Sequence, residues 1–187
     1  LQKFIGTDDA GNATITIDDQ VLTLEGVSPE DLSVDNFTNL DTLGATEGDD
    51  ILTGTDFDEI IDGFAGNDTI VAGGGDDTVF GGSGDDTLSG GDGGDTLDGG
   101  DGQDTVDYSD VAGVKVDLAQ GTGAVNPSNT DTLTGIENVI GSAQTDVITG
   151  DDQANTIWGG AGNDTLGGAA GDDVIDGGAG NDTLSGG

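Results

Sequence analysis

Large aliphatic residues recur every nine residues along two stretches of the chain. The first stretch runs from Leu43 to Val106 and the second from Val139 to Leu184. Within each short group x-U-x, where U is the aliphatic residue, the two-residue alternation of a β-strand points U inward and its neighbours outward. Three residues are too few for anything but a short strand. The pattern therefore predicts fourteen short strands, each with one inward aliphatic side chain.

The residues between these strands are rich in Gly and Asp. The clearest units, Gly81–Ser89 and Gly99–Asp107, read GGSGDDTLS and GGDGQDTVD. Both fit G-G-x-G-x-D-x-U-x, and the glycines permit positive φ and close backbone approach, as a turn requires. Two units then form one coil of 18 residues, with two strands and two turns. Stacked coils predict an all-β fold, a parallel β-roll in which two sheets face each other across the aliphatic side chains.

The repeat pattern divides the chain into four segments. Residues 36–107 form the first block of repeats and residues 132–187 the second. Residues 1–35 contain two expected strands, Ala13–Ile17 and Val21–Leu24. An open stack of coils needs its last rung covered against edge pairing, so we expect this segment to cap the roll. The alternative is that it belongs to a preceding domain.

Residues 108–131 form an insertion, because Val106 and Val139 are 33 residues apart, which is not a multiple of nine. Aliphatic residues alternate with polar ones from Val114 to Leu118, which predicts an exposed edge strand. The stretch from Gly121 to Asn129 reads as a loop. The insertion is either a lateral hairpin on one roll or a spacer between two rolls, and we favour one continuous roll.

Composition narrows the chemistry. The 187 residues include 39 Asp plus Glu against two Lys and no Arg, giving a formal net charge of −37. Nucleic acid is excluded as a partner because so few cations are available to pair with phosphates. Cys and His are absent, which excludes Ser-His-Asp and Cys-His catalysis and the usual zinc sites. No apolar run is long enough for a membrane span.

The remaining chemistry is cation binding. Every second turn lies above its predecessor at about 4.8 Å, so the sixth-position carboxylates stack at that spacing. Two unit charges at this distance repel by about 3.5 kcal/mol at an effective dielectric of 20. The roll cannot close unless cations cancel this repulsion. Carboxylate and carbonyl oxygens select calcium or magnesium, and flexible carbonyl-rich loops suit the larger coordination number of calcium.

The array resembles the repeat-in-toxin (RTX) family of calcium-binding nonapeptide repeats, also called hemolysin-type repeats. The resemblance covers about two thirds of the chain, and the stretches VKVDL and GIENVIGS in and after the insertion also resemble this family. It implies that each ion is held by two turns 18 residues apart. One turn would supply the carbonyls of positions two and four, and the later turn those of positions one and three. Each turn adds its sixth-position carboxylate.

Transferred to this sequence, the family pattern names the following residues. The carboxylate ligands would be Asp50, Asp68, Asp77, Asp86, Asp95, Asp104, Asp146, Asp164, Asp173 and Asp182. Ligands in the turns of the first block would be Gly63, Ala65, Gly73, Gly75, Gly81, Gly82, Ser83, Gly84, Gly90, Gly91, Asp92, Gly93, Gly99, Gly100, Asp101 and Gly102. Those in the second block would be Gly159, Gly160, Ala161, Gly162, Gly168, Gly171, Gly177, Gly178, Ala179 and Gly180.

Some units depart from the pattern. Gly is replaced at the fourth position by Phe57, Gln144 and Gln153. The sixth-position Asp is replaced by Glu59, Glu137 and Asn155. Because sites that use these turns are weakened, we expect about six to nine calcium ions.

The resemblance implies a calcium-binding module of a secreted bacterial protein. Such a module leaves the cell through type I secretion machinery, disordered at low calcium, and folds in the extracellular medium. The alternative is a module that attaches a neighbouring enzyme or adhesin to an extracellular polysaccharide, a surface layer or the cell surface. The outward-facing aromatic residues Phe80 and Trp158 are its candidate contacts. We expect no catalytic activity, since the repeat pattern accounts for most carboxylates as ligands.

Overall fold

The structure, a computed structural model, describes residues 4–7, 13–17, 20–24, 45–126 and 129–187. The chain divides into two units, Leu1–Leu40 and Asp41–Gly187. In the first unit, β1 (Phe4–Thr7), β2 (Ala13–Ile17) and β3 (Gln20–Leu24) form an antiparallel sheet in that order. The two strands expected in this segment are therefore confirmed. Its capping role stays a prediction, and the first expected repeat, around Leu43, lies outside the described residues.

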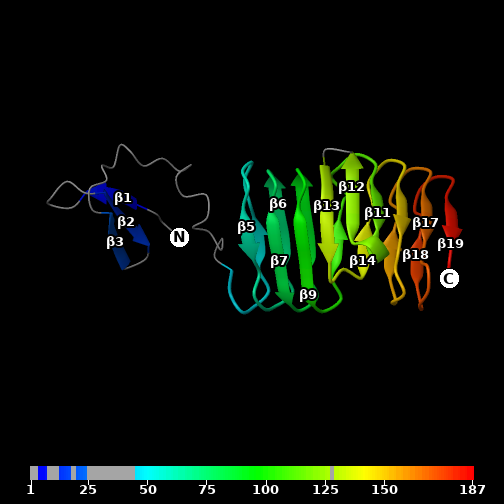
Figure 1. The fold of residues 1–187 in the computed structure, drawn as a ribbon, viewed down its shortest axis with the longest axis horizontal. Coiled ribbons are helices and arrows are strands. Elements are labelled where there is room, and N and C mark those ends of the chain that lie inside the picture. The colour runs from blue at the N-terminus through cyan, green and yellow to red at the C-terminus, as the bar shows by residue number, and fades with distance from the viewer. Residues whose placement is uncertain (1–3, 8–12, 18–19, 25–44, 127–128) are drawn as a thin grey trace. The chain divides into compact units, whose positions relative to one another are not determined.

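The second unit is a β-roll of two sheets (Figure 1). The seven-stranded sheet contains β4 (Ile51–Thr53), β6 (Thr69–Gly74), β8 (Thr87–Asp92), β10 (Thr105–Asp107), β14 (Asn138–Ile140), β16 (Thr156–Trp158) and β18 (Val174–Asp176). The nine-stranded sheet contains β5 (Ile60–Asp62), β7 (Thr78–Ser83), β9 (Thr96–Asp101), β13 (Asn129–Thr134), β12 (Thr122–Asn126), β11 (Lys115–Asp117), β15 (Val147–Thr149), β17 (Thr165–Gly167) and β19 (Thr183–Ser185). Apart from the one-turn 3-10 helix η3 (Leu118–Gln120), the described part of the roll has no helix.

The strand register confirms a coil of 18 residues. Leu52 of β4 pairs with Ile70 of β6, which pairs in turn with Leu88 of β8, all in parallel. The eighth-position aliphatic residues point between the two sheets, and those from Ile61 to Leu166 are almost fully buried. Ile175 is only partly buried and Leu184 is exposed, since they lie in the last described coil. The predicted all-β parallel roll with an aliphatic interior is confirmed.

The insertion is incorporated into the nine-stranded sheet. β13 pairs in parallel with β9, and β12 and β11 follow as antiparallel neighbours before β15 continues the parallel order. Both sheets therefore run through the insertion, and the roll is continuous, as favoured from the sequence.

Two expectations about the insertion are wrong. β11 is not an edge strand, because β12 and β15 flank it on either side. Two-residue alternation marks a strand with one buried face but does not report whether its edges are paired. The expected loop from Gly121 to Asn129 contains β12. The sequence pattern does not indicate this strand, because Gly123 and Ala124 lack the large alternating side chains that mark a strand.

Glycines in the turns let the backbones of successive coils approach one another. Gly82 has φ +109, and a Cβ atom there would lie 2.0 Å from the carbonyl oxygen of Phe64 in the previous coil. Gly84 has φ +126, and its Cβ would lie 2.0 Å from the oxygen of Gly66. By contrast, a Cβ on Gly167 would meet nothing closer than an atom of Ser185 at 3.9 Å. Glycine is therefore sterically required at these second and fourth positions but not at Gly167.

We expect Gly82→Ala to destabilise the roll by more than about 1–2 kcal/mol, the cost of left-handed backbone in an L-residue, because a backbone overlap adds to it. Gly167→Ala is the matched control and should leave stability within about 0.5 kcal/mol. Thermal unfolding at one fixed calcium concentration measures both. Equal effects of the two substitutions would contradict the close stacking of the turns.

Candidate metal centres

The turns of the roll lie along two edges. The turns on the first edge lead from the seven-stranded to the nine-stranded sheet, and those on the second edge lead back. Sixth-position residues of the first edge include Asp77, Asp95, Asp146 and Asp164. Those of the second edge include Asp68, Asp86, Asp104, Asn155 and Asp173. Because the coil repeat is fixed by strand pairing, each edge holds a column of acidic side chains one coil apart.

One oxygen of each of these carboxylates binds the backbone. Asp86 Oδ1 accepts a hydrogen bond from the Asp68 amide at 2.8 Å, and Asp104 Oδ1 accepts one from the Asp86 amide at 2.8 Å. On the first edge, Asp95 Oδ1 accepts from the Asp77 amide at 2.9 Å. The same bond joins Asp164 to Asp146 and Asp182 to Asp164. These bonds aim each carboxylate into the turn and tie successive coils together.

The second carboxylate oxygen has no such partner. The buried Oδ2 atoms without any hydrogen bond belong to Asp68, Asp77, Asp86, Asp95, Asp104, Asp164 and Asp173. Leaving a buried polar atom unpaired costs about 1–3 kcal/mol, and more when the group is charged. Seven such atoms in regular positions indicate that a ligand is needed there, and an anionic oxygen requires a cation.

Carbonyl oxygens converge on the same places. A Cβ on Gly63 would lie 2.4 Å from Asp68 Oδ2 and 2.6 Å from the oxygen of Gly81, the first position of the following turn. The carbonyls of Phe64 and Gly66, at positions two and four, face the glycines of that following turn. The family resemblance assigns the carbonyls of these positions as calcium ligands. The donor set consists of hard oxygen atoms, which fits calcium.

The third-position carbonyls are already hydrogen-bonded. Ser83 accepts from the Gly66 amide, Asp92 from the Gly75 amide and Asp101 from the Gly84 amide, each at 2.9 Å. Ala179 accepts from the Gly162 amide at 2.8 Å in the second block. A carbonyl oxygen has two lone pairs, so these bonds leave room for a second interaction. The predicted role of position three as a ligand stays a prediction.

Burial makes these carboxylates hard to ionise. Desolvation raises the pKa of Asp77, Asp95 and Asp104 to about 6, and the charges of neighbouring carboxylates add to the effect. The backbone hydrogen bond each of them accepts acts in the opposite direction. Burial also raises the pKa of Asp68, Asp86 and Asp164. A bound cation would reverse this balance by stabilising the ionised form.

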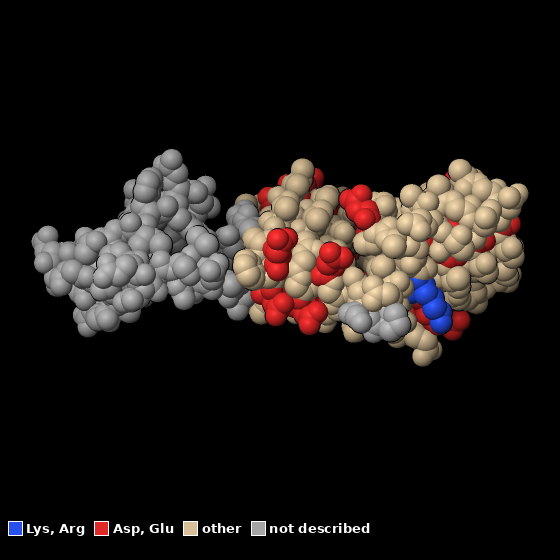
Figure 2. Space-filling model, turned by 90° about the horizontal axis from the view of Figure 1, so that it is seen from above, with Lys and Arg blue, Asp and Glu red and all other residues tan. Residues whose placement is uncertain are grey.

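The acidic side chains do not gather into conventional metal clusters. Within the described ranges, no group of three or more acidic side chains is placed to hold one ion. On the face drawn in Figure 2, acidic side chains lie at several separate places on the roll. This arrangement is expected where most ligands are backbone carbonyls and each turn adds only one carboxylate.

Three sixth-position side chains have protein hydrogen-bond partners where the regular turns leave an oxygen unpaired, and the predicted ligand roles of Asp50 and Asp146 stay predictions. Both oxygens of Asp146 accept bonds: Oδ2 from the Ser142 amide at 2.7 Å, and Oδ1 from the Ser142 hydroxyl at 2.9 Å and the Val114 amide at 2.7 Å. Asp50 Oδ2 accepts from the Thr46 amide and hydroxyl. Asn155 donates its side-chain amide to the carbonyl of Glu137 and accepts from the Asp151 amide.

Sequence reasoning missed two buried residues. Asp131 continues the first edge, since its Oδ1 accepts from the Asp95 amide at 3.0 Å across 36 residues. Asn129 donates its amide to the carbonyl of Gly91, and its buried Oδ1 has no partner. The available signal was Leu133, which follows Leu97 by four nine-residue periods and makes Asp131 a sixth position. The residues before Asp131 lack the turn glycines, so the repeat unit that contains Asp131 and Leu133 does not match the nine-residue pattern.

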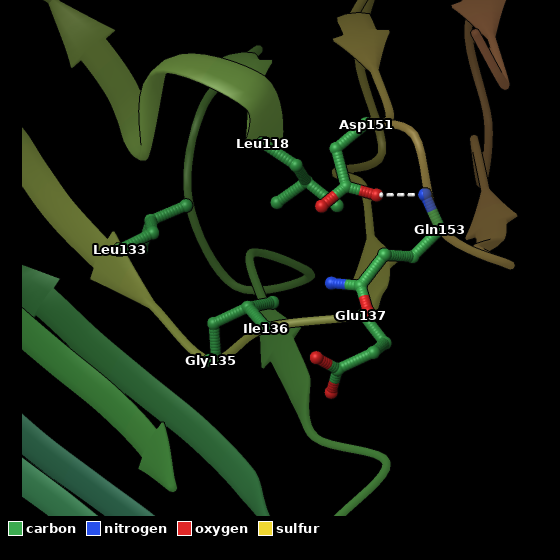
Figure 3. Close-up of a pocket in the computed structure, with 7 residues that line it drawn as sticks. All are labelled: Leu118, Leu133, Gly135, Ile136, Glu137, Asp151 and Gln153. Carbon is green, nitrogen blue, oxygen red and sulfur yellow. Dashed lines mark hydrogen bonds between the residues drawn. The ribbon is translucent and has the colours of Figure 1, made fainter. Parts of the chain in front are cut away.

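A small pocket opens beside the insertion on the second edge (Figure 3). Leu118, Leu133 and Ile136 form its apolar side, and Glu137, Asp151 and Gln153 its polar side. The cavity volume is about 70 Å³. Small-molecule sites usually have about 300–1,000 Å³, so this pocket is too small for a typical organic ligand.

A family model describing the RTX calcium-binding nonapeptide repeat matches the chain in four copies, at residues 44–79, 71–106, 131–166 and 162–187. The third match begins at Asp131, the residue that continues the column of carboxylates on the first edge. No curated protein matches the chain. No helix in the described part of the chain is long and apolar enough to cross a membrane. The four matched ranges cover most of the roll and contain the stacked carboxylates. The chain therefore belongs to the family of RTX calcium-binding nonapeptide repeat proteins.

Proposed function

We propose that this chain is a calcium-dependent folding module of a secreted protein. The observation that supports the proposal is the set of seven buried carboxylate oxygens without a partner, all at the sixth position of a turn. In the absence of a cation these groups oppose folding, because each must be either buried unpaired or protonated. Metal binding to such turns supplies free energy to folding itself.

The proposed module is disordered inside the producing cell and folds outside it. Cytosolic calcium is too low to fill sites of the affinity usual for extracellular modules, on the order of 10⁻⁴–10⁻³ M. An unfolded chain can pass through a secretion channel, and extracellular calcium then drives folding. The family resemblance supports export by type I secretion machinery. The carboxylates act as calcium ligands in this proposal, and we assign no catalytic step to them.

The alternative of polysaccharide attachment has less support. Phe80 and Trp158 are exposed, at 39% and 40%, as expected. However, Phe80 lies on β7 of the nine-stranded sheet and Trp158 on β16 of the seven-stranded sheet. Two aromatic rings on different sheets do not make one platform on which a sugar chain could stack.

Calcium should convert the metal-free chain from disordered to β-structured in a cooperative transition at about 10⁻⁴–10⁻³ M, whereas magnesium at the same concentrations should not. Far-UV circular dichroism during each titration measures the transition. A fully β-structured spectrum in excess chelator would overturn the folding role.

A pair of matched variants separates ligation from net charge. Asp77→Asn removes a buried carboxylate with an unpaired oxygen, whereas Asp152→Asn removes an exposed one. We expect Asp77→Asn to raise the midpoint calcium concentration severalfold and Asp152→Asn to leave it nearly unchanged. Equal shifts would mean that overall charge, rather than the turn site, controls folding.

Mild acid should partly replace calcium. The folded pKa of about 6 for Asp77, Asp95 and Asp104 lies above the ordinary value of 3.8, so the folded state binds protons more tightly than the unfolded state. Their destabilising effect is absent below about pH 3.8 and develops fully as pH rises through about 6. The metal-free chain should therefore gain β-structure as the pH falls from about 6 to about 4, measured by circular dichroism.

The control for this pH effect replaces Asp77, Asp95 and Asp104 together with Asn, which has nearly the same shape but does not titrate. The triple variant should show a smaller gain in β-structure over the same pH range. An identical pH response in both proteins would show that other groups are responsible.

A further inference from the structure

The insertion differs from both repeat blocks in how its buried polar groups are satisfied. The unpaired carboxylate oxygens fall in two groups. One group runs from Asp68 to Asp104 in the first block, and the other consists of Asp164 and Asp173 in the second block. Between these groups, Asp131 and Asp146 are equally buried, yet both oxygens of each accept hydrogen bonds from the protein. The need for a cation is therefore interrupted at the insertion on the first edge.

Tyr108 supplies the missing partner at Asp131. Its hydroxyl donates to Asp131 Oδ2 at 2.8 Å, the atom that corresponds to the unpaired Oδ2 of Asp95 one coil earlier. The Tyr108 side chain is 3% exposed. Burial and the adjacent Asp131 carboxylate raise the pKa of Tyr108 above its usual value, so the hydroxyl keeps the proton that it donates.

Gly123 provides the space for this contact. It lies directly opposite Asp131 in the pairing of β12 with β13. A Cβ on Gly123 would lie 1.9 Å from the Tyr108 hydroxyl oxygen, although Gly123 is a strand residue outside the repeat pattern. The glycine, the tyrosine and the aspartate thus form one fitted arrangement.

The second edge is also closed by protein groups at the insertion. Asn155 replaces the sixth-position carboxylate, and its amide donates to the Glu137 carbonyl at 3.0 Å. The interior contains more buried apolar side chains at the insertion than in a single regular coil. Besides the eighth-position residues, it contains the buried side chains of Tyr108, Val114, Val116, Leu118 and Ile136. The antiparallel pairs β11–β12 and β12–β13 add hydrogen bonds that need no ion.

We propose that the insertion is a calcium-independent clasp, in which the Tyr108 hydroxyl takes the place of an ion beside Asp131 and the junction stays folded when calcium leaves the flanking turns. The proposal rests on the calcium-binding function proposed for the two repeat blocks. The calcium sites accordingly form two arrays separated by this junction. One buried side-chain atom of the insertion, Asn129 Oδ1, has no partner. The side-chain amide of Asn129 donates to the carbonyl of Gly91 in the last first-edge turn of the first block, so we assign Asn129 to that array rather than to the clasp.

Hydrogen exchange of the full chain, in calcium and then in excess chelator, tests the clasp. We expect chelation to speed exchange by at least about a hundredfold in residues 63–104 and 159–182, but by less than about tenfold in residues 108–140. Equal acceleration in all three regions would overturn the clasp and leave the proposed function intact. Slow exchange everywhere in chelator would overturn the calcium dependence itself, and with it the distinction of the junction.

Two variants break the clasp by different means. Tyr108→Phe removes the hydroxyl and Gly123→Ala displaces it, and each should speed exchange of residues 108–140 in chelator by about tenfold or more. Gly167→Ala, a strand glycine with open space around it, is the control. Unchanged exchange in Tyr108→Phe would overturn the role of the hydroxyl.

Counting bound calcium by equilibrium dialysis adds a readout that a merely structural change would not mimic. Asp131→Asn and Asp77→Asn make the same chemical change at equivalent positions of the same edge. We expect Asp77→Asn to bind fewer ions than the unmodified chain and Asp131→Asn to bind the full number. Loss of an ion in Asp131→Asn would show that Asp131 is a calcium ligand and would overturn the proposal.

Discussion

The roll depends on burying columns of carboxylates along both of its edges. Each regular sixth-position Asp gives one oxygen to a backbone amide of the preceding coil, and the structure leaves the other oxygen without a hydrogen bond. The aliphatic interior cannot form without this arrangement, because the same coil repeat that stacks Leu52 on Ile70 also stacks Asp50 on Asp68. Burying these columns of carboxylates is costly unless something cancels their charge. For hard oxygen donors in flexible turns, calcium fits best.

The sequence predicted the repeat blocks well because one period controls both the interior and the turns. Leu88 and Asp86 follow from the same nine-residue spacing, and strand pairing then places the carboxylates in columns. The insertion could not be predicted in this way. β12 carries no strong alternation, and the pairing of Leu133 with Leu97 depends on a hairpin that returns the chain to the sheet after 36 residues.

Ligand assignment from the family pattern has a similar limit. The pattern identifies Asp146 as a ligand from its position, but it does not predict that Ser142 donates to both carboxylate oxygens. The ligand role of Asp146 stays a prediction. Position in the repeat does not report which donors a neighbouring residue brings. Conversely, the contact of Tyr108 with Asp131 joins residues 23 apart in irregular sequence, so only the three-dimensional arrangement reveals it.

Hydrogen bonds along the edges tie successive turns of a block together. Within a block, a sixth-position side chain binds the amide of the preceding coil, and a fifth-position side chain binds that of the following coil, as Asp86 and Asp85 do. Each turn is thus held from both directions, which favours cooperative folding of a block. At the junction the first-edge column of hydrogen bonds begins again at Asp146, whose Oδ1 accepts from the Val114 amide. The two blocks therefore meet directly in the seven-stranded sheet, where β10 pairs with β14, and through the strands of the insertion in the nine-stranded sheet.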